Sequence, residues 1–460
     1  MSARVTHVIQ SLSRGGAGRA TVSLAQPGCT IISLTPADPL MRAEAVAAGA
    51  TVLESGEARA ALEAADVVIV HFWNTPELHE LLRGGLPPVR LALWVHVAGD
   101  TAPQIVTRQV ARLADAVAVT AAQSASLPVF EKQPLVVPAA PDPRRFAGAV
   151  ATPHAGFRVG YVGNVDFVKM HPRYVELSAA AEVPGVRFVV CGSGESSAAL
   201  AAQARRLEVE ERMEFRGYVE EIAPVLSELD VFGYPLAPGS YATSDLALQE
   251  AMGAGVPPVV LASSAIHLLV EHGVTGLVAR DEAEYPRAIE YLHANPGERL
   301  RLGANAREQA RRRGPAEVAR EWAQICEELL RRPKRSHPAR LLTGAAAFVE
   351  SLGETAPEFA LSLFSASDEE AIEAERQIAA APPALASPAG GGVLHYRRRY
   401  PDDGHLRLWA GLLFAAAGKH ALAVAELKHA RELGCDTPRV RDYLARSAEP
   451  IGAGKVVFTR

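Results

Sequence analysis

Short apolar runs alternate with Ala-rich segments at helical spacing along the first two thirds of the sequence. In the N-terminal part these runs predict strands over residues 4–10, 30–34, 66–70, 90–97 and 114–119. Strands that alternate with helices form a parallel sheet covered by helices on both faces. We therefore predict a Rossmann-like domain over residues 1–150.

A proline-rich segment at residues 134–146 follows this domain and has the composition of an interdomain connector. The alternation of strands and helices then resumes and predicts a second Rossmann-like domain over residues 151–332. Two such sheets joined by a hinge are expected to leave a cleft between facing strand C-termini, where a donor and an acceptor can meet.

The pattern changes at about residue 336, where strand signals disappear and Ala-rich helical periodicity continues to residue 460. A Pro/Ala/Gly stretch at 381–392 separates two helical groups. The second group resembles one tetratricopeptide repeat, although any Ala-rich helical hairpin gives a similar pattern. The matching positions are Gly411, Phe414, Ala423, Leu427 and Ala430. The predicted fold class is therefore α/β, with two Rossmann-like domains followed by an all-α extension.

The stretch from residue 232 to 261 has the clearest local pattern. It predicts a strand ending at Tyr234, a Pro/Gly loop, a helix from about residue 243 to 253, and a strand over 259–261. Thr243, Ser244 and Asp245 can cap the free backbone N–H groups of this helix. A helix N-terminus at the end of a strand is where open α/β sheets bind anionic groups.

Glu250 lies about two turns inside the same predicted helix. A carboxylate at this place is suited to accept hydrogen bonds from a diol such as a ribose. An amphipathic helix packed through glycine would explain residues 251–255 but not the acidic side chain.

Composition narrows the possible partners. The chain has 460 residues, 48% of them hydrophobic and 22% charged, with a net charge of -5. This balance gives no reason to expect nucleic acid as a partner. Four separated cysteines with apolar neighbours indicate buried free thiols rather than disulfides or a zinc site.

The expected location is the cytoplasm. The N-terminus lacks the long apolar core of a signal peptide, and no uninterrupted apolar run approaches the ~18 residues of a membrane span. Peripheral contact with a membrane remains open.

Three separated motifs, RGGAGRA at 14–20, GYVGNVDFVKMHP at 160–172 and EAMGAGVPPVV at 250–260, are similar to those of the retaining GT-B glycosyltransferases of family 4. The resemblance covers about residues 4–330. It implies the two-domain fold predicted above, with the last helix of the second domain crossing back to the first.

The resemblance also implies site residues around the donor. Backbone N–H groups at Gly15 and Gly16 would face the donor phosphate, although the pair could be only a tight turn. Lys169 would neutralise the diphosphate, unless it is simply a solvated lysine after a loop. Gly163 would let the backbone approach the donor. Asn164 stands where the family has an arginine, so either Arg14, Arg19 or Arg280 substitutes for that charge, or donor binding is weaker or different.

Within the helix of the central stretch, Glu250 corresponds to the second glutamate of the family's acidic motif, which holds the ribose. The first glutamate is replaced by Ala242. We expect Ser240, Thr243, Ser244 and the cap residue Asp245 to contact the donor instead.

Two histidines at predicted strand ends complete the candidate site. His96 corresponds to the family histidine near the anomeric centre, and His71 is expected on the acceptor side. A histidine at a strand end can also be only a satisfied polar residue. At the carboxyl edge of a parallel sheet, however, it faces the expected cleft.

The predicted activity is retaining transfer of a hexosyl group from a nucleotide-sugar to an acceptor hydroxyl. UDP is favoured by its frequency in the family, and neither a cofactor nor a metal ion is expected. The helical extension favours a protein or peptide acceptor, but a lipid or small molecule is not excluded. Two alternatives remain: a catalytically degraded module that only binds a nucleotide-sugar, suggested by Ala242 and Asn164, and a scaffold that recruits a protein.

Overall fold

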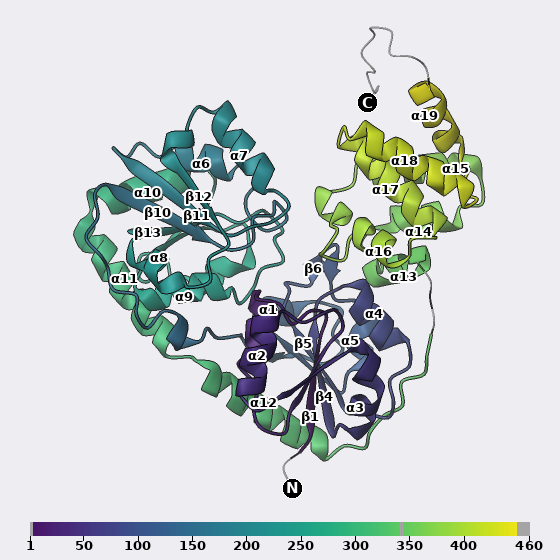
Figure 1. Cartoon of the computed structure of the whole chain (residues 1–460), viewed down its shortest axis with the longest axis horizontal. Helices are drawn as coiled ribbons and strands as arrows, with labels where there is room; N and C mark the ends of the chain where they lie inside the picture. Colours follow the sequence, from purple (N-terminus) through teal and green to yellow (C-terminus); the bar gives the residue numbers. More distant parts are fainter. Residues whose placement is uncertain (1–2, 341, 343, 449–460) are drawn as a thin grey trace. The chain divides into compact units, whose positions relative to one another are not determined.

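The computed structural model describes residues 3–340, 342 and 344–448. It divides into two compact units, each built from segments that are not continuous in sequence (Figure 1). The first unit consists of Met1–Phe72, Pro87–Thr101 and Arg108–Ser336. The second consists of Trp73–Leu86, Ala102–Thr107 and His337–Arg460.

The first unit contains two parallel sheets, which confirms the predicted α/β class. The N-terminal sheet has the strand order β3-β2-β1-β4-β5-β8-β9. Its strands are β1 (Val5–Ile9), β2 (Thr30–Ser33), β3 (Thr51–Glu54), β4 (Val67–Phe72), β5 (Leu91–Val95), β8 (Ala116–Val119) and β9 (Leu135–Val136). Its helices are α1 (Gly16–Val22), α2 (Pro39–Ala47), α3 (Ala58–Ala64) and α5 (Arg108–Leu113).

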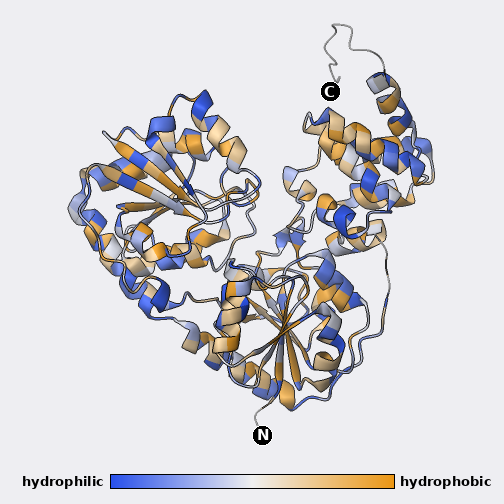
Figure 2. Cartoon of the chain, in the orientation of Figure 1, coloured by the Kyte–Doolittle hydropathy of each residue, from blue (hydrophilic) through white to orange (hydrophobic). Residues whose placement is uncertain are grey.

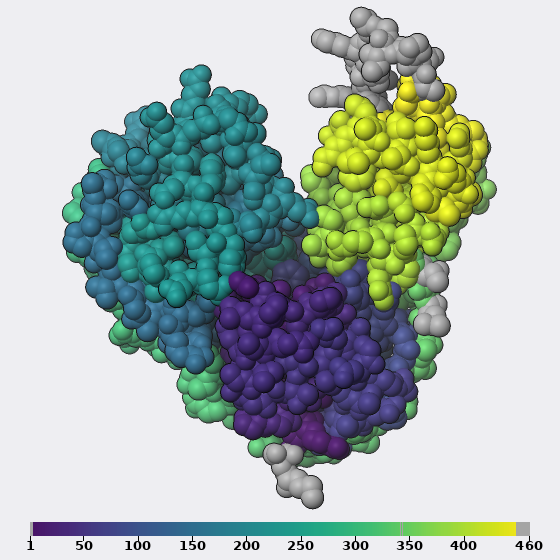
Figure 3. Space-filling view, in the orientation of Figure 1, coloured from purple at the N-terminus to yellow at the C-terminus, as the bar shows by residue number. Residues whose placement is uncertain are grey.

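All five strands predicted for this domain are present, whereas β3 and β9 were not predicted. β3 has only four residues and two of them are exposed, so its apolar signal is weak. β9 is a two-residue strand inside the proline-rich segment. In the space-filling view, the N-terminal residues (purple) form much of the surface of the first sheet's domain on the face shown (Figure 3).

The second sheet has the order β12-β11-β10-β13-β14-β15. Its strands are β10 (Phe157–Val162), β11 (Val186–Cys191), β12 (Met213–Gly217), β13 (Val231–Tyr234), β14 (Pro258–Leu261) and β15 (Leu277–Ala279). Its helices are α6 (Tyr174–Ala179), α7 (Ser197–Arg206), α8 (Ile222–Ser227), α9 (Leu246–Ala254), α10 (Glu284–Ala294) and α11 (Pro296–Arg311).

The central stretch folds nearly as predicted. Of the three candidate caps, Asp245 is the one that caps α9, accepting a hydrogen bond from the Leu248 backbone N–H at 3.2 Å. Gly255 ends the helix with a left-handed φ of +83°. Gly253 lies inside the helix, where a side chain would collide with the ring of Phe146.

The long helix α12 (Pro315–Leu330) follows the second sheet and packs against the first. Its buried stripe includes Val318, Trp322 and Leu329, which share a core with residues of β4 and β5. The rings of Trp322 and Trp94 lie 5.4 Å apart. Burial of this stripe ties the end of the second domain to the first sheet.

In the part of the second unit that the structure describes, the regular elements are helices and the short strand β7 (Gln104–Ile105). Its helices are α4 (Pro76–Arg83), α13 (Gly344–Leu352), α14 (Pro357–Phe364), α15 (Asp368–Ala379), α16 (Val393–Arg399), α17 (Gly404–Ala416), α18 (His420–Glu432) and α19 (Pro438–Ala448). Aromatic side chains form its core, among them Phe348, Phe359 and Trp409.

The presence of α4 in this unit was not indicated by the sequence. α4 follows β4 directly, yet its charged residues pair with the C-terminal helices. Glu77 lies 3.1 Å from His395, Glu80 lies 2.7 Å from Arg399, and Arg83 lies 2.6 Å from the nearly buried Glu350. The Arg83–Glu350 pair in particular fixes α4 within the unit, because both side chains are nearly buried and loss of one would leave a buried charge.

The Pro/Ala/Gly stretch at 381–392 is a packed loop rather than a free spacer. A side chain at Gly391 would overlap the carbonyl oxygen of Asn74. The Gln104 side-chain amide donates a hydrogen bond to the Gly390 carbonyl at 2.6 Å. Small residues are therefore required here by close approach of the backbone.

Apolar residues concentrate in the strands and on the inner sides of the helices (Figure 2). Within residues 3–340, 342 and 344–448, no helix is long and apolar enough to cross a membrane. Cys29, Cys191, Cys326 and Cys435 are buried free thiols, which confirms the prediction from their spacing.

We predict that Gly391→Ala destabilises the protein much more than Gly418→Ala. Both glycines have left-handed φ values, +78° and +70°, but nothing lies within 4 Å of a side chain at Gly418. Gly418→Ala should lower the free energy of unfolding by about 1 kcal/mol through backbone strain alone. Gly391→Ala should lower it several-fold more, measured by urea denaturation. Equal losses would contradict the packed loop.

Candidate functional site

The candidate site residues lie near the points where the strand order reverses. In the first sheet this switch falls between β1 and β4, and in the second between β10 and β13. Open α/β sheets bind ligands outside the carboxyl ends of the strands at such points. His71 is the second-last residue of β4. Gly163 follows β10, and Lys169 lies in the loop before α6.

Lys169 is held in a buried ion pair with Asp245. Its Nζ atom lies 2.8 Å from Oδ2 of Asp245, and the Tyr234 hydroxyl donates to Oδ1 at 3.2 Å. Burial alone would lower the pKa of Lys169, but the nearby charge of Asp245 raises it above its ordinary value. Lys169 is therefore charged, and it is bound to the residue that caps α9.

Gly163 lies against the same lysine. A Cβ atom at this position would be 3.0 Å from the Tyr234 hydroxyl and 3.5 Å from Nζ of Lys169. Asn164 follows, and its carbonyl accepts a hydrogen bond from the Tyr161 hydroxyl at 2.9 Å. The absence of a side chain at Gly163 thus keeps the space beside the ammonium group open.

The glycine loop of the first domain reaches the N-terminus of α9. Gly15 is the N-cap of α1 and Gly16 its first residue. A Cβ atom at Gly16 would lie 3.9 Å from the Leu246 side chain, at the first residue of α9. The N-termini of α1 and α9 are therefore neighbours. At Gly18, a side chain would overlap the Ser13 carbonyl, which explains the lack of the family's acidic residue there.

The three arginines considered as replacements for Asn164 differ in their surroundings. Arg14 pairs with Asp38 at 2.9 Å and with Glu220 at 2.6 Å, and Arg19 lies 3.7 Å from Glu220. Arg280 is 85% exposed and pairs with Glu284. Of the three, Arg14 belongs to the glycine loop and Arg19 to α1, the helix whose start lies next to α9.

Glu250 is buried in α9, and Arg145 is its cationic partner. The Nε atom of Arg145 donates to Oε1 of Glu250 at 2.6 Å, and the carboxylate is 4% exposed. Burial raises the pKa of Glu250, and the Arg145 charge opposes that rise. Sequence reasoning missed Arg145, although a carboxylate inside an apolar helix calls for a cation. Asp142 caps the neighbouring 3₁₀ helix Pro143–Arg145, its side chain accepting from the Arg144 backbone N–H at 2.9 Å.

The hydroxyl groups before α9 connect it to the carboxyl edge of the first sheet. Thr243 Oγ1 lies 2.6 Å from Thr120 Oγ1, and Ser244 Oγ donates to the carbonyls of Thr120 and Ala139. Ser240 Oγ accepts from the Ala242 N–H at 3.4 Å. In the structure, these hydroxyls thus bind protein groups. Ala242 itself is buried.

Three histidines meet at the carboxyl edge of the first sheet. Nδ1 of His7 lies 3.1 Å from Nε2 of His71, and Nδ1 of His71 lies 3.1 Å from Nε2 of His96. Burial lowers the pKa of His7 to about 4 and that of His96 to about 3. Burial and the two neighbouring rings lower the pKa of His71 well below its ordinary value. All three rings are neutral at pH 7. His7 was missed because it lies inside an apolar strand.

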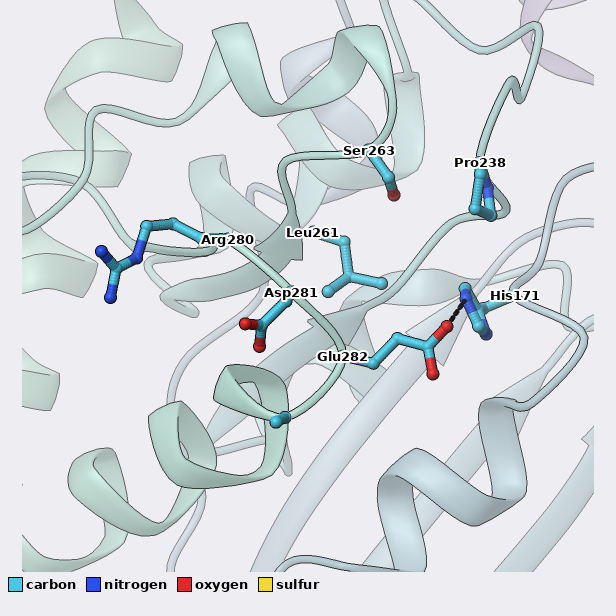
Figure 4. Close-up of a pocket in the computed structure, with 8 residues that line it drawn as sticks. His171, Pro238, Leu261, Ser263, Arg280, Asp281 and Glu282 are labelled. Carbon is cyan, nitrogen blue, oxygen red and sulfur yellow. Dashed lines mark ion pairs between the residues drawn. The ribbon is translucent and has the colours of Figure 1, made fainter.

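A separate hollow of about 410 Å³ lies at the carboxyl ends of β14 and β15 (Figure 4). His171 and Glu282 form an ion pair in its lining, with Nε2 and Oε1 3.3 Å apart. Of the residues considered for the donor site, Arg280 lines this hollow, whereas Lys169, Asp245 and Glu250 do not. Among the described residues, no group of His, Cys, Asp or Glu side chains is arranged to hold a metal ion.

Sequence comparison places the strongest similarity in the second domain. The model of the family Glycosyl transferases group 1 matches residues 156–295, a segment that includes Lys169, Asp245 and Glu250. A curated relative, the lipopolysaccharide core biosynthesis glycosyltransferase LpsE of Rhizobium meliloti (strain 1021), is 28% identical over 144 residues. This match covers 31% of the present chain and 42% of the relative, so the chain spans less than half of that protein.

Solved structures share the fold of the first unit. HepE of Anabaena, crystallised with UDP-glucose, superposes with a TM-score of 0.59 at 16% identity, covering 71% of this chain and all of HepE. Sucrose-phosphate synthase of Thermosynechococcus elongatus gives a TM-score of 0.54 at 17% identity, covering 71% of this chain and 99% of the synthase. These likenesses confirm the arrangement of two Rossmann-like domains.

We predict that the neutral histidine cluster makes stability fall in mild acid. Between pH 6.5 and 4 the unfolded chain binds a proton at His7 that the folded chain does not bind, so stability falls as the pH falls. At pH 5 this linkage amounts to roughly 2 kcal/mol for His7. Urea denaturation at pH 7 and pH 5 should show a smaller pH effect in His7→Asn than in wild type. An unchanged pH effect in the variant would contradict the assignment.

Proposed function

We propose that this chain is a retaining glycosyltransferase that moves a hexosyl group from a UDP-sugar to an acceptor hydroxyl. This proposal rests on the proximity of Gly16, at the start of α1, to Leu246, at the start of α9. At the same helix start, Asp245 binds Lys169. Each helix N-terminus offers unpaired N–H groups and a partial positive charge, which suit an anionic diphosphate.

In this proposal Lys169 and the two helix N-termini stabilise the departing diphosphate. The bond between the anomeric carbon and the phosphate oxygen breaks, and the acceptor oxygen bonds to that carbon from the same face. The acceptor's proton passes to the departing phosphate oxygen. No protein nucleophile, metal ion or cofactor takes part.

The remaining residues orient the donor. Glu250 accepts hydrogen bonds from the ribose hydroxyls, while the charge of Arg145 opposes the rise in the pKa of its carboxylate. His96 contacts the sugar, His71 lies on the acceptor side, and the backbone at Gly163 approaches the donor. The donor is also contacted by Asn164, Ser240, Thr243 and Ser244. The three hydroxyl groups give up their present hydrogen bonds to protein groups when the donor binds.

The choice of donor is supported by similarity. HepE, whose fold this chain shares, has been crystallised with UDP-glucose. The similarity to a group 1 family model covers the segment that contains Lys169 and Glu250. We place the reaction in the cytoplasm, with peripheral membrane contact open.

For the acceptor, we propose a protein or peptide that binds the helical unit. The hairpin of α17 and α18 brings small and large side chains together as a tetratricopeptide repeat does. A Cβ atom at Gly411 would lie 2.6 Å from the Leu427 side chain, and the Ala423 backbone lies beside the same position. This close packing supports a repeat-like unit, whose common role is to bind polypeptide.

A second candidate is a sugar-nucleotide-binding module without transfer activity. It is favoured by Ala242, which puts a buried methyl group at the first acidic position, and by Asp245, which already neutralises Lys169. Binding of UDP without turnover would identify this state.

We predict that the purified chain is stabilised by a UDP-sugar and transfers the sugar with retention of anomeric configuration. Lys169→Ala should lower kcat/KM roughly 10²–10³-fold, since it removes a charge that stabilises the leaving group. Thermal shifts with a panel of sugar nucleotides, followed by NMR of the product's anomeric centre, provide the measurement.

Arg280→Ala is the matched control, because Arg280 is an exposed cation of the same domain outside the proposed donor site. It should retain wild-type activity. Thermal stabilisation with no transfer or hydrolysis would favour the binding module. Equal activity of wild type, Lys169→Ala and Glu250→Gln would reject the proposed site.

A further inference from the structure

The histidine cluster spans three adjacent strands of the first sheet. His7 lies in β1, His71 in β4, and His96 follows the last residue of β5. In the register of the sheet, His71 is opposite Ile9 on one side and Trp94 on the other. Side chains two residues apart point to the same face of a strand. The three imidazoles are therefore on one face, the face that α1 covers through Thr21.

Thr21 forms the fourth member of this cluster. Its hydroxyl oxygen lies 2.9 Å from the Ala17 carbonyl one turn earlier in α1, and 3.0 Å from Nδ1 of His71. A hydroxyl group has one hydrogen, and the carbonyl of Ala17 can only accept. The hydrogen of Thr21 therefore points to Ala17, and toward His71 the Thr21 oxygen acts as acceptor.

This assignment determines where each imidazole carries its proton. His71 must be protonated at Nδ1, so its Nε2 accepts the hydrogen bond from Nδ1–H of His7. The Nδ1–H of His71 is also directed at Nε2 of His96, 3.1 Å away, so that nitrogen accepts. A neutral imidazole has one N–H, and in His96 it must then be at Nδ1.

We infer that Thr21, His71 and His7 are positioning residues that fix His96 as the Nδ1–H tautomer, so that His96 donates a hydrogen bond to a hydroxyl oxygen of the bound sugar. Among the described residues, Nδ1 of His96 has no hydrogen-bond partner, and its ring is the least buried of the three. The inference rests on the proposed function for the identity of the ligand.

The same chain of contacts connects the glycine loop to His96. Thr21 lies five residues after Gly16 in the one helix α1. The element whose N-terminus is proposed to hold the diphosphate therefore also sets the hydrogen-bonding direction of the residue proposed to hold the sugar. Such a fixed donor is already oriented before the ligand arrives, which favours the transition state.

The test compares Thr21→Val, which removes the hydroxyl and keeps the shape, with Thr21→Ser, which keeps the hydroxyl. Long-range ¹H–¹⁵N NMR spectra of the full chain with labelled histidine report the tautomer of each ring. In wild type and Thr21→Ser, His71 and His96 should both be protonated at Nδ1. In Thr21→Val, both should change to Nε2–H or to a mixture. Nε2–H in wild type, or an unchanged spectrum in Thr21→Val, would overturn the inference.

Kinetics then test the role in transfer. Thr21→Val should lower kcat about tenfold with little change in the donor KM, and Thr21→Ser should not. In a His96→Ala background, Thr21→Val should cause no further loss, because its effect acts through His96. An equal loss in both backgrounds would show a structural effect only and would overturn the positioning role.

Failure of the proposed function gives a different result. If wild type transfers sugar from no nucleotide donor, the catalytic role of His96 is lost along with that proposal. The tautomers measured by NMR do not depend on turnover. If wild type is active and the spectra of Thr21→Val match those of wild type, the positioning role alone is wrong.

Discussion

The ion pair between Lys169 and Asp245 determines much of the candidate site. Asp245 caps α9, binds Lys169 and accepts from Tyr234, so one carboxylate joins the loop after β10, the end of β13 and the start of a helix. A charge this deeply buried is stable only with its partner in place. Any anionic ligand at the mouth of α9 must accommodate Asp245, because it already holds the lysine. The site is therefore more nearly neutral than a lysine beside a helix N-terminus would suggest.

The departures from the family 4 motifs have local physical reasons. A residue with a side chain cannot stand at Gly18, because the Ser13 carbonyl occupies that space. Ala242 is buried beside hydroxyl groups that bind the first sheet, where a carboxylate would lose its water without a cation. Arg145, by contrast, supplies positive charge to Glu250 from the connecting segment.

Much of the first unit could be predicted because its strands are continuous apolar runs and its key helix has a clear cap and a terminal glycine. The helix α9 began and ended within about three residues of the predicted limits. Contacts between distant segments could not be predicted in this way. The spacing of residues along the sequence does not indicate that Arg145 pairs with Glu250, nor that His7 contacts His71. His7 in particular has the position of an ordinary strand residue, and only the register of β1 against β4 places it beside His71.

The membership of α4 in the helical unit has a consequence for biosynthesis. The residues that cover α4, among them Glu350, His395 and Arg399, are synthesised more than 250 positions after it, since Glu350 is 267 residues beyond Arg83. Domains tend to fold as the chain leaves the ribosome, N-terminal part first. Here the first sheet can form while α4, with its apolar side chains Leu78 and Leu82, still lacks its partners. α4 therefore stays without these partners until the residues from His337 onward have been synthesised, and only then can the helical unit be completed.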